Sequence, residues 1–510
     1  FAGVIAGAGS VSKTGAGTAV LSGANTYSGG TLVSAGRLQI GNGGATGAIA
    51  GAITNNAVLA FNRTGTYALT NTLGGTGVIV QEGPGILERR NFGVGSNSVV
   101  VNAGTYKVNT GSALGVGSFT LGNTNGGSAS ATLLHTDNGS FSATNNIVLG
   151  SSSGAQTIAG SLQNRGSTGN YDLSGNITGN GSLVIALTNA SATNVWNATF
   201  SGTIDNAGII TYTNNFAGTN TVAATISGNL GANVTGLTVQ SGRLTLSAGN
   251  ADYTAGALVQ TGATLQIGAG GASGAIAGAI TNNGSLIFNR TDLSTNNSTI
   301  SGSGSLTKDG AGTVVLSGLN NYAGGTTLNL GTLRLDHVNA AGTGTIMQSG
   351  GTSTLAINTT GTVANAMSIF NIQTLQTVTL SGNKTLNNAS YTVEAGTTTT
   401  EAGVLSGSGG ITKQGTGTLT VTASNTFTGT VDVQAGTLNL ASSTGSAAGA
   451  TANVMVATNA VLLIAQSGQV SDTAPVTLSG GTIRRATEVS EVFGSLNLTT
   501  SSFLDFGGGT

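Results

Sequence analysis

The chain has 510 residues, of which 86 are Gly, 2 are Pro and none is Cys, and only 6% are charged. Abundant Gly without a Gly-X-Y period excludes collagen, and the lack of Cys excludes both a disulfide scaffold and a thiolate metal site. A net charge of −1 provides no basic surface for nucleic acid, and no apolar run is long enough for a transmembrane helix.

The chain begins at Phe1 without a signal peptide, so we expect a processed product or a piece of a longer protein. Helix is disfavoured throughout, because Gly costs about 1 kcal/mol per helical position relative to Ala. Hydrophobic residues make up 38% of the chain and alternate with small polar ones. This period of two is typical of strands with one buried face.

Three stretches repeat one pattern without gaps: residues 7–40, 302–335 and 407–440. Degraded copies begin at Gly75 and Gly179, and a second duplication relates residues 39–64 to residues 266–291. One unit of about 20–25 residues is too small to bury a core alone, whereas stacked units share one. The repeats therefore predict a solenoid.

Aliphatic residues hold the same positions in every copy, and we expect them to point inward: Leu21, Leu316 and Val421; Val33, Leu328 and Val433; and Leu38, Leu333 and Leu438. We predict an all-β fold, an elongated parallel β-helix of roughly 20–25 coils at about 4.8 Å each. It is expected to form one continuous solenoid over residues 1–510. Antiparallel hairpins are the structural alternative, but their two-residue Asn-Gly or Asp-Gly turns do not recur here.

The three copies follow the pattern GxGxLxKxGxGTLxLSGxNTYxGGTxVxxGxLxL. This pattern resembles the autotransporter-associated β-strand repeat, also called the passenger-associated transport repeat. The resemblance implies a right-handed parallel β-helix that is exported through a Gram-negative-type envelope. It also implies that the chain is secreted or displayed at the cell surface.

Three further positions recur in the copies: Lys13, Lys308 and Lys413; Asn25, Asn320 and Asn425; and Tyr27, Tyr322 and Phe427. The lysines could form a row that binds a ligand, but we favour snorkelling turn residues that bond corner carbonyls. The aromatic residues could stack on carbohydrate, but the Phe variant lacks a hydroxyl, so we favour side chains that cover the coil edge. We expect the asparagines to bond the backbone and to stack between coils.

The two histidines each lie near an aspartate, His135 near Asp137 and His337 beside Asp336, but no nucleophile elbow accompanies either pair. Acidic residues are scattered, and two mixed-charge patches are interpreted as solvated ion pairs: Glu82, Glu88, Arg89 and Arg90, and Arg484, Arg485, Glu488 and Glu491. Calcium nonapeptides would need an Asp at fixed spacing beside the Gly pairs, which is missing. We predict no catalytic residue, no metal site and no cofactor.

The favoured function is a non-enzymatic extracellular β-solenoid that acts as an adhesin or surface scaffold. Its flat, uncharged surface could bind host cells, neighbouring cells or glycans weakly over many coils. The alternatives are a filament subunit that associates end to end and a carbohydrate-active enzyme. Ice binding is not favoured, because it needs regular Thr-x-Thr rows and Thr397–Thr400 is the only dense threonine cluster in the sequence.

Overall fold

The computed structural model describes residues 1–89, 95–109, 114–136, 140–162, 169–189, 196–216 and 223–507. Across these residues the regular structure is short β-strands in parallel pairs, and no α-helix is present. None of the described segments is a helix that could cross a membrane. The chain divides into two compact units: unit 1 is Phe1–Gln266 with Gly274–Gly278, and unit 2 is Ile267–Ser273 with Ala279–Thr510.

Unit 1 contains four parallel ladders of strands. The first comprises β1 (Val11–Lys13), β3 (Thr31–Val33), β5 (Ile53–Asn55) and β8 (Leu73–Gly74). The next comprises β2 (Thr18–Leu21), β4 (Arg37–Ile40), β6 (Val58–Phe61), β9 (Val78–Gln81), β11 (Ser98–Val101), β13 (Phe119–Leu121), β16 (Ile147–Leu149), β19 (Ile177–Gly179) and β22 (Ile204–Asn206).

Unit 1 has two further ladders. One comprises β7 (Thr66–Ala68), β10 (Ile86–Arg89), β12 (Gly104–Val108), β14 (Ala131–His135), β17 (Gln156–Leu162), β20 (Leu183–Asn189), β23 (Ile209–Phe216), β25 (Gly236–Val239) and β27 (Ala257–Val259). The other comprises β15 (Phe141–Ala143), β18 (Gly169–Leu173), β21 (Trp196–Phe200), β24 (Ala223–Ile226) and β26 (Arg243–Leu246), and β28 (Thr264–Ile267) follows in the chain.

Unit 2 begins with β29 (Ile280–Asn282) and β32 (Ile300–Ser301) and continues as three ladders. The first ladder is β30 (Ser285–Phe288), β33 (Ser305–Lys308), β35 (Thr326–Leu328), β37 (Ile346–Gln348), β40 (Met367–Thr374), β42 (Lys384–Val393) and β44 (Leu405–Ser406). The second ladder is β31 (Leu293–Asn296), β34 (Thr313–Leu316), β36 (Thr332–Leu335), β38 (Thr354–Ile357), again β40 and β42, β45 (Ile411–Gln414), β47 (Val431–Val433), β49 (Val454–Ala457), β51 (Pro475–Ser479) and β53 (Ser495–Leu498). The third ladder is β39 (Gly361–Val363), β41 (Val378–Leu380), β43 (Thr398–Glu401), β46 (Thr418–Val421), β48 (Thr437–Leu440), β50 (Val461–Ile464), β52 (Thr482–Arg485) and β54 (Phe503–Asp505).

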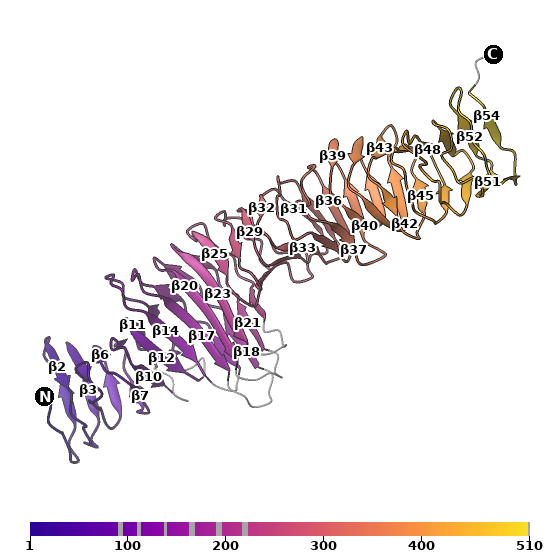
Figure 1. Ribbon diagram of the computed structural model, residues 1–510. Coiled ribbons are helices and arrows are strands. Elements are labelled where there is room, and N and C mark those ends of the chain that lie inside the picture. The colour runs from indigo at the N-terminus through magenta and orange to yellow at the C-terminus, as the bar shows by residue number, and fades with distance from the viewer. Residues whose placement is uncertain are drawn as a thin grey trace. The chain divides into compact units, whose positions relative to one another are not determined.

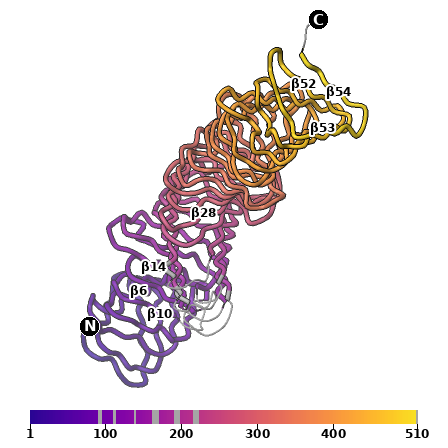
Figure 2. The backbone as a smooth tube through the Cα atoms, turned by 45° about the vertical axis from the view of Figure 1, so that its right-hand side comes forward, coloured from indigo at the N-terminus to yellow at the C-terminus, as the bar shows by residue number. Residues whose placement is uncertain are grey.

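The backbone of each unit winds so that every coil pairs with the next in parallel register. In unit 1, Val33 pairs with Lys13 on one side and with Asn55 on the other. In unit 2, Thr327 lies between Thr307 and Met347 in the same way. Figure 1 shows these strands ranked one after another within each unit, and Figure 2 shows the successive loops of backbone. The predicted parallel β-solenoid is confirmed, with about 22 turns.

Alternate residues of each strand point into the coil, because side chains on a strand alternate between its two faces. In β46 the buried residues are Leu419 and Val421, while Thr418 and Thr420 are partly exposed. Leu316 and Val421 have no exposed surface, and Leu21 is also buried. The core of each unit is therefore a set of aliphatic stacks inside the coils.

One glycine closes the same corner in each of the three best copies, at Gly36, Gly331 and Gly436. Their φ angles are +67°, +66° and +66°, in the left-handed region that side-chain-bearing residues rarely adopt. A Cβ atom on Gly331 would collide with the carbonyl oxygen of Gly312 in the coil below. These corners therefore need glycine for both conformation and space.

The duplicated segments fold alike in the two units. Each contains an Ile-Thr-Asn strand, β5 or β29, with both end residues buried. The asparagine side chains donate to the next coil, Asn55 to the carbonyl of Val78 at 3.1 Å and Asn282 to that of Ser305 at 2.8 Å. The duplication is thus one of structure as well as of sequence.

Candidate functional site

The recurring lysines donate hydrogen bonds to backbone carbonyls at the coil corners. Their acceptors are Gly15 and Ala35 for Lys13, Gly310 and Leu330 for Lys308, and Gln414, Gly415 and Ala435 for Lys413. The bond from Lys308 Nζ to Leu330 is 3.0 Å long. Lys308 and Lys413 are fully buried, and this burial lowers the pKa of each ammonium group to about 8. Both ammonium groups are therefore directed at the protein's own backbone.

The lysines of the second and third copies lie on different faces of unit 2. Lys308 belongs to β33 in the first ladder, whereas Lys413 belongs to β45 in the second. Following the register from Lys413 back through the second ladder leads to Val314 and not to Lys308: the intervening partners are Tyr391, Ile372, Leu355 and Leu333. The third copy is thus rotated by one face relative to the second, so the lysines form no continuous row.

The recurring asparagines each connect three coils. Asn320 Oδ1 accepts a hydrogen bond from the amide of Ile300 at 2.7 Å, and its Nδ2 donates to the carbonyl of Ala340 at 2.7 Å. The same pair of bonds joins Asn25 to Ile5 and Ala48, and Asn425 to Leu405 and Ala447. All three side chains are buried. Each amide therefore satisfies one backbone group of the coil before it and one of the coil after it.

The recurring aromatic residues are buried and have matched partners. The Tyr27 hydroxyl lies 2.6 Å from Thr31 Oγ1, and the Tyr322 hydroxyl lies 2.5 Å from Thr326 Oγ1. In the third copy Phe427 replaces Tyr, and Val431 stands where the other copies have Thr. Both hydroxyl groups are lost together, so no buried polar atom is left without its partner. None of the three rings is exposed enough to stack on a carbohydrate.

The two histidines hold unrelated positions. His135 is buried, its ring centroid lies 4.8 Å from that of Phe141, and its Nε2 lies 3.2 Å from the carbonyl oxygen of Asn109. Asp137, which we expected nearby, is outside the described residues. His337 Nδ1 accepts from the amide of Asn339 at 3.1 Å. Neither ring is part of a described nucleophile–base pair.

The first charged patch separates into individual contacts. Glu82 pairs with Arg37, and Glu88 pairs with Lys107 at 2.8 Å. Arg89 is buried, and burial lowers its pKa. Its Nη1 donates at 2.7 Å to two backbone carbonyls, those of Leu69 and Asn71. Arg90 lies outside the described residues. The interpretation as a solvated patch is thus wrong for Glu88 and Arg89, which are both buried.

A buried ion pair that no sequence pattern indicated lies inside unit 2. Lys384 Nζ is 2.8 Å from Glu401 Oε2 and donates to the carbonyl of Gly382 at 2.8 Å, and neither side chain of the pair is exposed. Burial raises the pKa of Glu401, and the adjacent Lys384 opposes that shift. The Tyr391 hydroxyl is also buried, and its pKa is raised by burial and by the nearby Glu401 carboxylate. The group lies in the core, away from any surface that a ligand could reach.

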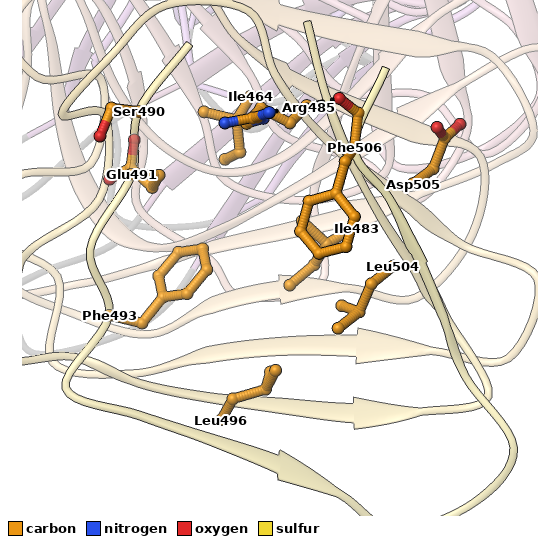
Figure 3. A pocket seen from close by; sticks show the side chains of 10 residues that line it. All are labelled: Ile464, Ile483, Arg485, Ser490, Glu491, Phe493, Leu496, Leu504, Asp505 and Phe506. Atoms are coloured by element: carbon orange, nitrogen blue, oxygen red, sulfur yellow. Dashed lines mark hydrogen bonds between the residues drawn. The ribbon is translucent and has the colours of Figure 1, made fainter. Parts of the chain in front are cut away.

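A cavity of about 300 Å³ lies beside the last strands of unit 2. Figure 3 shows Glu491 and Phe493 on one side and Leu504, Asp505 and Phe506 on the other. The carboxylate of Glu491 accepts backbone hydrogen bonds from Gln469 and Val470 at 2.7 and 2.9 Å. Burial nonetheless raises its pKa.

The second carboxylate of this cavity, Asp505, is also engaged. It accepts a hydrogen bond from the amide of Gly507 at 3.1 Å and one from the Nε–H of Arg484 at 2.8 Å, and these bonds lower its pKa. Both carboxylates thus accept hydrogen bonds from the protein itself. No cluster of three metal-ligating side chains occurs among the described residues.

Comparison with known families finds the passenger-associated-transport-repeat at residues 11–40, 240–267, 306–335 and 411–440. The chain carries this repeat in four copies. Three of them are the copies seen in the sequence. The fourth passenger repeat escaped detection because it lacks the lysine corner and has one more residue between Asn250 and Tyr253. Its asparagine still joins coils, accepting from the amide of Leu230 and donating to the carbonyl of Ala275, both at 2.9 Å.

A search of curated proteins finds the "Adhesin BmaC autotransporter" of Brucella suis biovar 1 (strain 1330), 38% identical over 96 residues. The match covers 19% of this chain and 3% of that protein. No solved structure matches the chain. The passenger repeats place the chain among proteins secreted or displayed at the surface of Gram-negative bacteria.

Proposed function

We propose that this chain is a non-enzymatic passenger scaffold that acts in adhesion at the bacterial surface. The observation that supports this most is that the recurring polar side chains of the passenger repeats form their hydrogen bonds within the protein. Lys, Asn and Tyr side chains bond to backbone or to each other inside the coils. The outward positions are mostly small and uncharged, so contacts with a partner would be individually weak and repeated over many coils.

The similarity to an adhesin passenger supports the same proposal. A direct test attaches the purified chain to beads and measures retention on mammalian cells, on bacterial cells and on a glycan panel. We expect retention above that of beads coated with an unrelated protein, and a steep rise with coating density because binding is multivalent. Retention equal to that of uncoated beads on every surface would overturn the adhesin proposal.

The same preparation tests for catalysis. Incubation with the glycan panel should release no reducing ends. Release that is abolished by the substitution Glu491→Gln or Asp505→Asn would instead show a carbohydrate-active enzyme, with the cavity of Figure 3 as its site.

A filament subunit that associates end to end remains the second candidate. Sedimentation at increasing concentration should then show growing assemblies, whereas a monomer at all concentrations would reject the filament.

A further inference from the structure

A column of threonines runs along the outward side of the third ladder of unit 2. Thr362, Thr379, Thr400 and Thr420 are register partners on four successive strands, β39, β41, β43 and β46. Asn439 continues the column on β48. This arrangement is not visible in the sequence, because the four residues are separated from one another by about one coil of chain.

A second column lies beside the first. Thr398, Thr418 and Thr437 are register partners, and the amide of Thr398 donates to Thr377 Oγ1 at 3.1 Å, which places Thr377 in the coil before. Thr377, Thr398 and Thr418 each stand two residues before a member of the first column. Three successive coils therefore present Thr-x-Thr rows. We call the eight threonines of the two columns the threonine face: Thr362, Thr379, Thr400 and Thr420 in the first column, and Thr377, Thr398, Thr418 and Thr437 in the second. The expectation that Thr397–Thr400 is an isolated cluster is corrected by this register.

Most hydroxyls of the threonine face are uncommitted. Within the described part of the chain, the side chains of Thr362, Thr379, Thr400, Thr418 and Thr437 make no hydrogen bond to protein. All five are partly or fully exposed. Their hydroxyls are therefore available to water or to a ligand.

The threonine face lies on strands that are well packed and regular in register. The residues beneath it are buried, among them Leu380, Leu419 and Leu438. Thr399 bonds Thr374 across the core at 2.6 Å. The register along β39, β41, β43, β46 and β48 has no shift, whereas β40 and β42 shift between Ile369 and Asn371. The hydroxyls therefore stand on a regular grid, about 4.8 Å between strands and about 6.7 Å along each strand.

We propose that the threonine face binds the surface of ice. Ice is an uncharged, two-dimensionally periodic array of hydrogen-bonding groups, and the threonine face is uncharged, periodic and rich in free hydroxyls. Each contact is weak, but contacts in register act together, as in other multivalent binding. A crystalline polysaccharide is a poorer partner, because its sugar rings favour aromatic platforms and the outward positions of β39, β41, β43, β46 and β48 have none.

The test grows a single ice crystal slowly from a solution of the fluorescently labelled full chain and measures the fraction of protein that enters the ice. We expect clear enrichment over an unrelated labelled protein. The variant Thr400→Lys with Thr420→Lys should lose this enrichment, because two long charged side chains interrupt the grid. The matched control is Thr307→Lys with Thr327→Lys, register partners on the first ladder, and it should retain enrichment.

Several results would overturn the proposal. One is exclusion of the unaltered chain from ice. Another is equal loss in both double variants once their thermal unfolding shows that each is folded. Binding to insoluble polysaccharide without entry into ice would assign the face to a glycan instead. None of these results bears on adhesion, which the bead assay tests separately.

Discussion

At the scale of single residues, the recurring polar side chains differ from ordinary surface residues because the coils enclose them. Lys308 and Lys413 were expected to snorkel, yet both have no exposed surface. A buried ammonium group is tolerated only when hydrogen bonds replace the lost water. The corner carbonyls supply those bonds.

Because Lys308 is buried, we expect its removal to lower the stability of the fold. The substitution Lys308→Ala leaves the carbonyls of Gly310 and Leu330 without their donor and opens a cavity. We expect a loss of about 2–4 kcal/mol in the free energy of unfolding. The matched change Lys13→Ala, at a partly exposed lysine with the same bonds, should cost less. Urea unfolding measures both, and an equal cost would contradict the role assigned to burial.

The aliphatic positions give a second residue-scale prediction. Leu316→Asp would place an unpaired carboxylate in the core, because Leu316 has no exposed surface. We expect a loss of several kcal/mol and a lower melting temperature. Leu319→Asp, at a leucine that is 59% exposed, should leave the melting temperature nearly unchanged. Similar melting temperatures for the two variants would refute the inward assignment of Leu316.

The lysines also predict a dependence of stability on pH. Burial holds the pKa of Lys308 and Lys413 at about 8, whereas the pKa in the unfolded chain is about 10.4. Between these values the unfolded chain binds more protons, so both lysines make the free energy of unfolding rise with pH. Urea unfolding at about pH 8 and about pH 10 should show a smaller rise for Lys308→Met with Lys413→Met than for the unaltered chain. The same change with pH in both proteins would contradict the lowered pKa values.

At the scale of strands and coils, the asparagines determine how well neighbouring coils hold together. Asn320 bonds the coil before it and the coil after it, so Asn320→Ala removes two buried hydrogen bonds. We expect a loss of about 2–4 kcal/mol and faster hydrogen exchange in both neighbouring coils. Asn321→Ala, at the exposed adjacent residue, is the control. Faster exchange in only one neighbouring coil would show that Asn320 does not connect both.

The strands were predictable where the apolar period is regular. Leu419 and Val421 alternate with Thr418 and Thr420, and both buried residues follow from that alternation. The change of face between Lys308 and Lys413 could not be predicted, because both copies have the same sequence pattern and only the strand register separates them. Lys384 and Glu401 belong to no motif, and only the folded register brings them together. The threonine face depends on the same register.

At the scale of the whole molecule, each unit is stabilised by the same two elements, aliphatic stacks inside and backbone pairing between coils. Such repeats need only their neighbours for stability, which lets a long scaffold be assembled from degenerate copies. The four passenger repeats share the buried asparagine that joins neighbouring coils, and the segments between them have internal bonds of their own, such as those of Asn55 and Lys384. Because the buried side chains stabilise the coils, the outward side chains can differ from coil to coil.

The account depends on coils that stack in the assigned parallel register, and the cysteine-free chain allows a direct measurement. Thr327 and Met347 are register partners on neighbouring coils and point outward. Their Cα atoms are about 4.8 Å apart, within the range of a disulfide. We predict that Thr327→Cys with Met347→Cys forms a disulfide under mild oxidation, and that Thr327→Cys with Ser368→Cys, two coils apart, does not. Cross-linking of the second pair in preference to the first would contradict the solenoid.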